Sequence, residues 1–398
     1  MQAGRLQSVV DWLIEGARSA PQVDGFMAET CERIVACGIP LWRSGVFVST
    51  LHPIMSGRGF IWRQGSGVTM TAAPYGIEES DDYLSSPIAG VYDTGREVRR
   101  RLRDADDIGN SSFLASMRAE GVTDYLALPV TFSDGQREAL SWSTRREGGF
   151  ADVDLDELRA IHAPLSRMIE IFLLRRTAAG LLDNYVGSRA GQRILAGQIR
   201  RGHTETMRAV IWLSDLRGFT PLSDRLPPDA IVELLNRYFD CQVEPIREQG
   251  GEVLKFMGDG LLAVFPVAED GSDLPAVCQA VLQAARASRA NVAAMEYMIG
   301  DEVLRGFRFG LALHVGEVLY GNIGGGSRLD FTCIGPAVNL AARLEKMAGQ
   351  LNRTVVASSA FVGPFTEGWT DLGEFPIAGF RSSERVHGLI DETPFERG

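Results

Sequence analysis

The sequence predicts an α+β protein made of two domains and a helical connector. Its 398 residues exceed what one ordinary hydrophobic core accommodates. The first half alternates short strand-like and helix-like segments, whereas a new pattern of apolar strand, glycine and helix begins at Ala209. We therefore expect a first domain over residues 1–175, a helical linker over 176–206 and a second domain over 207–390.

The bulk composition is globular, with 45% hydrophobic and 23% charged residues. A net charge of −11 opposes binding to nucleic acid or to an anionic membrane, because both attract basic surfaces. It leaves room for a small anionic substrate held locally by a metal ion. The five cysteines are scattered and form no Cys-x-x-Cys pair, which indicates reduced thiols.

Nothing in the chain resembles a leader or a membrane span. Asp11 and Glu15 interrupt the first apolar segment, which is typical of an amphipathic helix rather than a signal peptide. No stretch approaches the ~18 uninterrupted apolar residues of a membrane helix. We expect no membrane association and a cytoplasmic location.

In the first domain, helices are predicted to enclose antiparallel strands. Runs rich in β-forming residues and bounded by glycine predict strands at 44–51, 58–64 and 66–74. Two further runs within 124–146 are joined by a Ser-Asp-Gly turn, a hairpin signal. Helices are expected at 26–38 and at 152–176, the latter with acidic residues in its first turn.

This layout, together with "GGFADVDLDEL", resembles a GAF domain over residues 20–175. The resemblance rests on the arrangement of elements and not on ligating residues. It implies a GAF-like α/β sensor domain, which either binds an unknown small-molecule ligand or dimerises. His52, Cys31 and Cys37 are compatible with a haem or a bilin, but isolated residues of this kind are more often packing residues, and we favour packing.

The helix that leaves this domain carries an apolar stripe spaced by three and four residues. The stripe consists of Leu158, Ile161, Leu165, Met168 and Phe172. Such spacing is the seam of a parallel coiled coil, yet it extends over only about two heptads. A helix packed on its own domain is an equal alternative. A second helical stretch, 176–202, continues the linker.

Asp215 ends the apolar strand of "AVIWLSDLRGFT" (209–220) and is followed by Gly218 and a helix start. An acid at a strand end beside a glycine turn is a common metal ligand, and backbone N–H groups at a helix start bind phosphate. A simple cap is the alternative for this piece alone.

Asp259 lies near the tip of a predicted hairpin in "GGEVLKFMGDGLLAVF" (250–265). An ordinary Asp-Gly turn explains the piece when it is taken alone. Two acids from different strands, however, can converge on a pair of divalent cations that clamp the oxygens of a phosphoryl transfer.

Asn339 and Arg343 lie four residues apart in "RLDFTCIGPAVNLAARLEKMAG" (328–349), where residues 338–348 predict a helix. Residues at this spacing share one helix face. Together they suit a ribose and the charge that develops on a phosphate. Solvated helix residues are the alternative.

The three pieces together resemble, in order and spacing, the catalytic domain of class III nucleotidyl cyclases over residues 207–390, a ferredoxin-like α/β fold. The match includes "RFGLALHVGEVLYGNIG" (308–324), expected as a strand followed by a glycine-rich loop. By position, the resemblance implies metal binding by Asp215, Asp259 and the backbone carbonyl of Leu216. It implies ribose binding by Asn339 and transition-state stabilisation by Arg343. Gly218, Phe219 and Thr220, at the expected helix start, are the residues whose backbone N–H groups can bind the phosphates.

Lys255, one of only two lysines among 40 basic residues, matches the lysine that selects adenine. Thr332 sits where adenylate cyclases carry Asp or, in one subgroup, Thr. An ammonium only donates hydrogen bonds, so it suits N1 of adenine and opposes the N1–H of guanine. Thr332 can accept from the 6-amino group but can also donate. ATP is therefore the expected substrate, with some leakage to GTP.

The resemblance implies cyclisation of ATP to 3′,5′-cyclic AMP. The ribose 3′-hydroxyl, made more acidic by one Mg²⁺ or Mn²⁺, attacks the α-phosphorus, and pyrophosphate leaves with a second ion. The metal aspartates and the other site residues come from different subunits in this family, so a homodimer with two equivalent sites is implied.

One position departs from the family. Ala378 falls where many relatives carry a phosphate-gripping Lys, and Arg381 or an arginine of the 300s is the candidate replacement. Without one, we expect weak ATP binding and dependence on Mn²⁺ or on upstream activation. The rival functions are a guanylate cyclase, opposed by Lys255 and Thr332, and a catalytically silent nucleotide-binding module.

Overall fold

The computed structural model describes residues 4–103, 108–326 and 328–392. These residues form two compact units, and the division falls between Leu181 and Leu182. The division falls inside one helix and within the predicted linker. None of the helices in the described ranges combines the length and apolarity needed to cross a bilayer.

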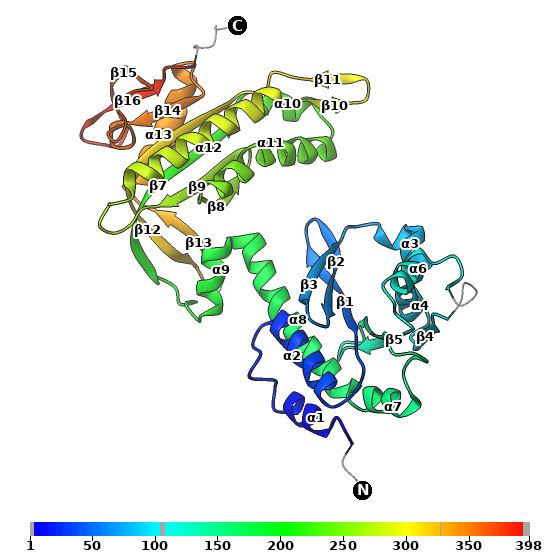
Figure 1. Ribbon diagram of the computed structural model, residues 1–398. Helices are drawn as coiled ribbons and strands as arrows, with labels where there is room; N and C mark the ends of the chain where they lie inside the picture. The colour runs from blue at the N-terminus through cyan, green and yellow to red at the C-terminus, as the bar shows by residue number, and fades with distance from the viewer. Residues whose placement is uncertain (1–3, 104–107, 327, 393–398) are drawn as a thin grey trace. The chain divides into compact units, whose positions relative to one another are not determined.

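The first unit is built on a six-stranded antiparallel sheet of order β3-β2-β1-β6-β5-β4 (Figure 1). In chain order its elements are α1 (Gln7–Ile14), α2 (Val23–Ala36), β1 (Arg43–His52), β2 (Met55–Arg63), β3 (Gly67–Ala73), η1 (Ile77–Glu79), α3 (Asp81–Leu84), α4 (Pro87–Thr94), β4 (Val98–Arg101), α6 (Ser112–Ala119), β5 (Asp124–Thr131), β6 (Arg137–Thr144), α7 (Asp152–Ala160) and α8 (His162–Val186). The predicted Ser-Asp-Gly hairpin is confirmed, because β5 pairs with β6 from Asp124↔Thr144 to Thr131↔Arg137.

Both faces of this sheet are covered. On β5, Leu126 and Leu128 enter the core beneath α1, α2 and α8, whereas Tyr125 and Ala127 face α4. This alternation follows from the two-residue period of a strand. Cys31 is fully buried in the same core, where it packs as a small apolar residue.

The predicted helix 152–176 is in fact two helices, with a break at Ile161. Pro164 has no N–H to donate to the carbonyl of Ala160, so the helix cannot run on without interruption. The second helix, α8, then continues to Val186, into the stretch 176–202 that was also expected to be helical.

The stripe expected as a coiled-coil seam instead faces its own domain. Leu158, Ile161, Leu165, Met168 and Phe172 are at most 6% exposed and belong to the core of the first unit. A coiled coil through these residues is therefore wrong, and the alternative of a helix packed on its own domain holds.

The second unit is built on a sheet of order β15-β16-β14-β12-β7-β9-β8, with β13 paired to β12. Its elements are α9 (Ser188–Leu195), β7 (Thr204–Leu216), α10 (Phe219–Arg225), α11 (Pro228–Glu248), β8 (Glu252–Met257), β9 (Gly260–Pro266), α12 (Leu274–Ala294), β10 (Tyr297–Ile299), β11 (Glu302–Leu304), β12 (Phe309–Gly325), β13 (Arg328–Ile334), α13 (Pro336–Gln350), β14 (Val355–Ser358), α14 (Ser359–Val362), β15 (Trp369–Pro376) and β16 (Ser383–Leu389).

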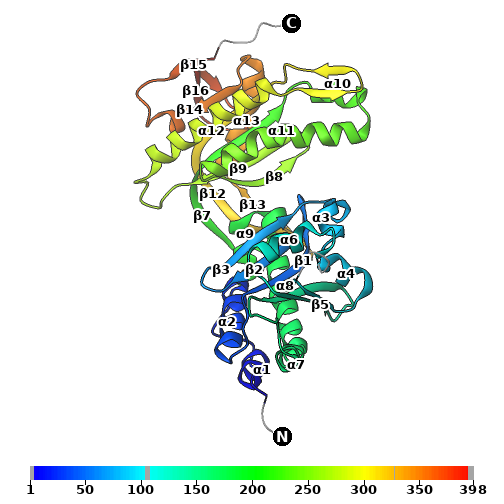
Figure 2. The same cartoon turned by 45° about the vertical axis from the view of Figure 1, so that its right-hand side comes forward.

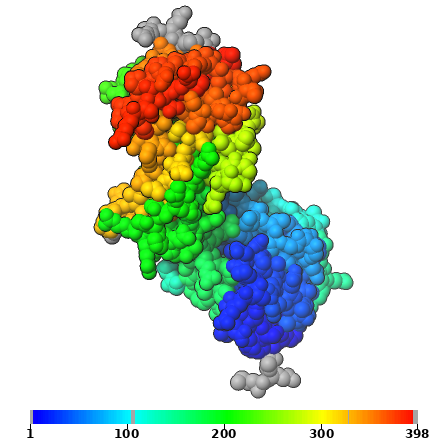
Figure 3. Space-filling view, turned by 90° about the vertical axis from the view of Figure 1, so that its left-hand side faces the viewer, coloured from blue at the N-terminus to red at the C-terminus, as the bar shows by residue number. Residues whose placement is uncertain are grey.

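Helices cover both faces of this sheet too. In Figures 1 and 2, α11 and α12 lie side by side on one face. On β7, Val210 and Trp212 pack beneath them, whereas Ala209 and Ile211 contact the face covered by α13. The strand β7 thus presents its odd-numbered residues towards α13. The C-terminal strands, orange to red, form one continuous surface of this unit in Figure 3.

The glycine-rich segment after the expected strand 308–324 is not a loop. β12 runs unbroken to Gly325 and pairs with β13 from Leu319↔Ile334 to Gly325↔Arg328. A Cβ on Gly321 would lie 2.2 Å from the carbonyl oxygen of His203, and one on Gly324 would lie 2.2 Å from that of Arg328. These glycines permit close backbone approach within the sheet.

Candidate functional site

Asp215 lies one residue before the end of β7, between two glycines. Its cross-strand neighbours are Gly260 on β9 and Gly310 on β12. A Cβ on Gly260 would lie only 3.3 Å from the Asp215 Oδ1 atom. The missing side chain of Gly260 leaves space beside this half-buried carboxylate.

Asp259 lies in the two-residue turn that joins β8 to β9. Gly258 adopts φ +68° there, which residues with a Cβ rarely do. The N–H of Leu216, at the end of β7, donates to the backbone carbonyl of Asp259 at 3.3 Å. This bond ties the hairpin turn to the strand end that carries Asp215, so acids 44 positions apart in the sequence become neighbours.

The two carboxylates interact electrostatically. Burial, followed by the neighbouring negative charges of Asp259 and Glu345, raises the pKa of Asp215 to about 6, while Arg217 opposes the shift. Mutual repulsion of this kind is what a bound cation relieves.

This donor set fits a divalent metal ion. Carboxylates are the ligands that Mg²⁺ and Mn²⁺ prefer, and Mg²⁺ sites are usually completed by water and by substrate phosphates. Among the described residues no three His, Cys, Asp or Glu side chains gather into a cage. Asp215, Asp259 and the backbone of Leu216 would therefore hold the ion together with oxygens from outside the protein.

Arg217 and Glu345 form an ion pair that the sequence analysis did not find. The Arg217 Nη2 atom lies 2.7 Å from the Glu345 Oε1 atom and also donates to the Glu345 backbone carbonyl at 2.9 Å. A Cβ on Gly310 would clash with both side chains. The pair joins the end of β7 to α13, and no local sequence signal marks it because its members are 128 residues apart.

The opposite face of β7 is held by a second contact that sequence reasoning missed. The buried Ser214 hydroxyl donates to the Gln242 Oε1 atom on α11 at 2.7 Å. The strand end is thus fixed from both faces.

Gly218, Phe219 and Thr220 stand at the start of α10. Gly218 adopts φ +73° as the residue that precedes the helix. Gly218 and Thr220 are exposed, whereas Phe219 packs against the core under α11 and α12. Their predicted contact with phosphate stays a prediction.

Asn339 and Arg343 project from α13 into solvent. Both are exposed, while Leu340, Ala341 and Leu344 on the same helix are buried, so the predicted shared face is confirmed. Within the described residues neither side chain makes a hydrogen bond or an ion pair, and the single chain does not join them to Asp215 and Asp259 by any such contact.

Lys255 and Thr332 lie on β8 and β13, two strands that contact each other without being paired. The Lys255 Nζ atom on β8 contacts the Asp330 Oδ2 atom on β13 at 2.7 Å. Thr332 is only 5% exposed, and its hydroxyl has no hydrogen-bond partner in the described ranges. Ala378 and Arg381 are exposed in the segment between β15 and β16.

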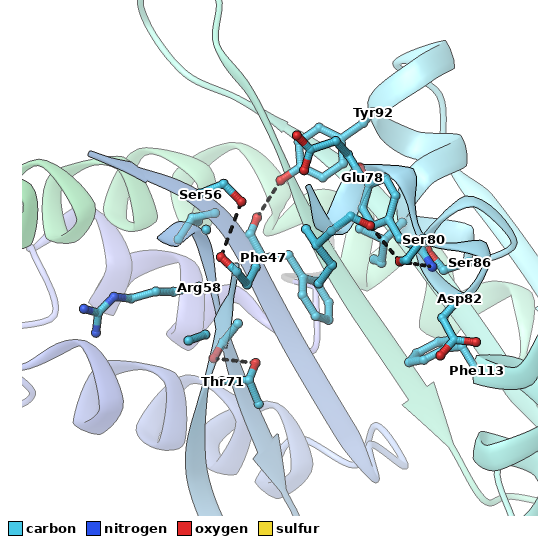
Figure 4. A pocket seen from close by; sticks show the side chains of 18 of the residues that line it. Phe47, Ser56, Arg58, Thr71, Glu78, Ser80, Asp82, Ser86, Tyr92 and Phe113 are labelled. Atoms are coloured by element: carbon cyan, nitrogen blue, oxygen red, sulfur yellow. Dashed lines mark hydrogen bonds between the residues drawn. The ribbon is translucent and has the colours of Figure 1, made fainter. Parts of the chain in front are cut away.

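The first unit contains a cavity of about 860 Å³ between its sheet and the segment from η1 to α6. Figure 4 shows Phe47, Tyr92 and Phe113 around it, with Arg58 extending away. The Tyr92 hydroxyl donates to the buried Glu138 at 2.7 Å. The lining is otherwise rich in serine and apolar groups.

Comparison with known proteins finds relatives of the second unit. Residues 203–384 match the adenylate and guanylate cyclase catalytic domain family. An adenylate cyclase of Anabaena cylindrica is 32% identical over 164 residues, which make up 41% of this chain and 32% of that protein. The chain thus covers about a third of the length of that relative.

Solved structures of both cyclase types are similar to this chain. The adenylyl cyclase CyaB from P. aeruginosa is 23% identical with a TM-score of 0.40, covering 48% of this chain and 97% of that one. The guanylate cyclase domain from Catenaria anguillulae in complex with GTP is 17% identical with a TM-score of 0.38, covering 46% and 97%.

Proposed function

Because residues 203–384 match an adenylate and guanylate cyclase catalytic domain, we propose that this chain is an adenylate cyclase. It converts ATP to 3′,5′-cyclic AMP and pyrophosphate. The observation that supports this most directly is the convergence of Asp215 and Asp259, from a strand end and a hairpin turn. Their negative charges repel each other there, and a bound cation would relieve that repulsion. Two neighbouring carboxylates that repel each other cost stability, and metal-dependent catalysis explains that cost better than a catalytically silent nucleotide-binding module does.

The roles of the chain's own residues follow from their chemistry. Asp215 and Asp259 bind and orient the metal–triphosphate, and Lys255 reads the purine. Asn339 orients the ribose, and the Arg343 guanidinium stabilises the charge that develops on the α-phosphate. Two bound Mg²⁺ or Mn²⁺ ions would acidify the 3′-hydroxyl and screen the leaving pyrophosphate. Positioning and charge stabilisation account for most of the catalysis.

ATP is favoured over GTP because the Lys255 ammonium only donates hydrogen bonds. N1 of adenine accepts one, whereas guanine carries an N1–H that would face the ammonium. A guanylate cyclase remains the second candidate, since proteins of both specificities share this domain.

The active form is a homodimer in our proposal. Asn339 and Arg343 are exposed and unpartnered within the described residues, while the two aspartates lie elsewhere on the same unit. A second copy would bring its Asn339 and Arg343 to the aspartates of the first, which gives two equivalent sites.

A free apolar stripe on α8 supports this dimer. Ile171, Leu174, Ala178 and Leu181 follow steps of three, four and three residues, and Leu174 is 63% exposed. The stripe lies on the face of α8 opposite Phe172, which is buried. A parallel α8 from a second copy would cover this stripe. The seam of the proposed coiled coil is therefore this stripe and not the buried residues Leu158 to Phe172.

The first unit serves, in our proposal, as the sensor that regulates the cyclase. Its 860 Å³ cavity is of a size that holds a small molecule. Glu78 and Asp82 lie at its margin and Arg58 extends away from it (Figure 4). This charge pattern disfavours a polyanion and suits a neutral or cationic aromatic molecule that stacks on the tyrosine and phenylalanine rings.

The cyclase assignment is tested by incubating the full chain with ATP or GTP and Mg²⁺ or Mn²⁺ and measuring cyclic nucleotide and pyrophosphate. We expect cyclic AMP to dominate and Asp259→Asn to abolish it. Asp240→Asn, at an exposed position on α11, is the matched control and should retain activity. Preferential formation of cyclic GMP would support the second candidate, and no cyclic product from either nucleotide would reject both.

The sensor assignment is tested separately by thermal shift of the full chain with a panel of small aromatic amines and amides. A compound that stabilises the wild type should change cyclase activity. The same compound should have no effect on Ser116→Trp, where the indole fills the cavity from α6. Equal stabilisation of both proteins would place its binding outside this cavity.

A further inference from the structure

Lys255 does not stand alone at the position proposed to read the purine. Its Nζ atom lies 2.7 Å from the Asp330 Oδ2 atom, although the two residues are 75 positions apart. The Lys255 side chain is 31% exposed and the Asp330 side chain 61%, so both ends of the pair are open to solvent. An ammonium and a carboxylate are thus presented side by side.

Thr332, the residue expected to accept from adenine, is buried. It is 5% exposed, and its hydroxyl oxygen is out of contact with solvent and has no protein partner in the described ranges. Asp330 is two residues earlier on β13, so it lies on the same side of the strand. Phe331, between them, points the other way into the core beneath α13. The accessible acceptor beside Lys255 is therefore Asp330 and not Thr332.

We propose that Asp330 is a specificity-determining residue of the purine site, accepting a hydrogen bond from the 6-amino group of adenine while Lys255 donates to N1. The inference rests on the proposed function. Adenine presents an acceptor and a donor at these adjacent positions, which match an ammonium and a carboxylate in contact. Guanine presents N1–H and a 6-oxo oxygen, so the same pair would place donor against donor and acceptor against acceptor.

This arrangement gives ATP selectivity a source that a threonine hydroxyl lacks. The hydroxyl rotates and can donate to a 6-oxo group as well as accept from an amino group. A carboxylate only accepts, and an unpaired carboxylate facing the 6-oxo oxygen of guanine is penalised. The aspartate therefore both attracts adenine and rejects guanine.

The test compares ATP with purine riboside 5′-triphosphate, which keeps N1 but lacks the 6-amino group. Binding to the full-length protein is measured by displacement of a fluorescent ATP analogue, and turnover by cyclic nucleotide formation. We expect the wild type to prefer ATP over the purine analogue by roughly 10- to 100-fold, the range of one hydrogen bond to a charged group.

Asp330→Ala should remove this preference and leave the purine analogue nearly unchanged. Asp330→Asn, whose amide both donates and accepts, should raise binding of GTP relative to ATP. Thr332→Val should leave the ATP preference in place. Thermal unfolding of each variant controls for loss of structure.

Three results would overturn the proposal. Equal loss of ATP and of the purine analogue in Asp330→Ala would mean that Asp330 only positions Lys255. Disappearance of the preference in Thr332→Val would return the role to the hydroxyl. A wild type that does not distinguish the two nucleotides would remove the contact altogether. Because binding is measured apart from turnover, a protein that binds selectively but makes no cyclic product would reject the proposed function alone.

Discussion

Arg217 holds Glu345 by two contacts at once, an ion pair of 2.7 Å to its side chain and a hydrogen bond of 2.9 Å to its backbone carbonyl. Glu345 is 5% exposed, and Arg217 follows the candidate metal ligands Asp215 and Leu216 directly in the chain. The bond therefore fixes the position of the metal-binding strand end relative to α13, which carries Asn339 and Arg343. In the proposed homodimer these two elements of one subunit would serve different active sites, so the Arg217–Glu345 pair would connect the two sites.

Replacing Arg217 by Ala should destabilise the second unit by about 3 kcal/mol, because it leaves the buried Glu345 carboxylate without a counter-charge. Urea unfolding at pH 7 measures the change. The control is Arg237→Ala, which breaks the exposed Arg237–Glu233 pair on α11 and should cost less than about 1 kcal/mol. Equal losses in the two variants would show that the Arg217 bond contributes no more than a surface pair.

The raised pKa of Asp215 predicts a pH-dependent stability in the absence of metal. In the folded chain the Asp215 carboxyl keeps its proton up to about pH 6. In the unfolded chain the same carboxyl, with a pKa of 3.8, releases its proton at a lower pH. The free energy of unfolding is therefore highest below about pH 4, as far as Asp215 determines it, and declines as the pH rises towards 6. The decline should be on the order of 1 kcal/mol, because the half-buried group is partly screened by solvent.

Urea midpoints measured in EDTA between pH 4 and 8 test this, with Asp215→Asn as the variant that lacks the titrating group. The wild type should lose stability relative to the variant across this window. Mn²⁺ added at pH 7 should restore the wild type and have little effect on Asp215→Asn. A parallel decline in both proteins would assign the pH dependence to another residue.

Two inactive variants should restore activity when their subunits mix. Asp215→Ala removes a metal ligand from one half of the site and Arg343→Ala removes the guanidinium from the other, so each homodimer has two defective sites. A heterodimer has one intact site. Co-expression with different tags and assay of the doubly purified heterodimer measures this, and roughly half of the wild-type rate is expected from the symmetry. An inactive, verified heterodimer would argue against a shared site.

Leu174→Glu should weaken the dimer because it places a charge in the centre of the exposed stripe on α8. Analytical ultracentrifugation should show more monomer, and specific activity should become dependent on protein concentration. Ile14→Glu makes the same kind of change at a residue of α1 that is 71% exposed and should leave association unchanged. If Leu174→Glu remains fully dimeric, the stripe is not the contact between copies.

The strands, helices and turn chemistry of this protein were largely predictable from the sequence because they are set by local patterns. The hairpin at Asp259, the helix that presents Asn339 and Arg343 on one face, and the Ser-Asp-Gly hairpin all follow from spacing over a few residues. Pro164 also signals the helix break in the sequence, but the apolar stripe that runs through it favours one continuous helix.

Sequence patterns gave wrong predictions where the structure of a segment depends on what packs against it. The heptad spacing of Leu158 to Phe172 is the same whether the partner is another helix or a sheet. Here these residues pack in the core of their own unit. The glycines of 321–325 were expected in a loop, but the approach of a neighbouring backbone makes them part of a strand.

By itself the sequence determined the chemical inventory of this protein: one acid at a strand end and one at a turn, one of only two lysines in an arginine-rich chain, and an asparagine and arginine one helical turn apart. Only the tertiary structure decided which of these meet. It brought Asp215 to Asp259, gave Lys255 an aspartate in place of the buried threonine, and joined Arg217 to Glu345. The reason is that side-chain type and local spacing are properties of the chain, whereas burial, counter-charge and accessibility depend on residues that fold in from far along it.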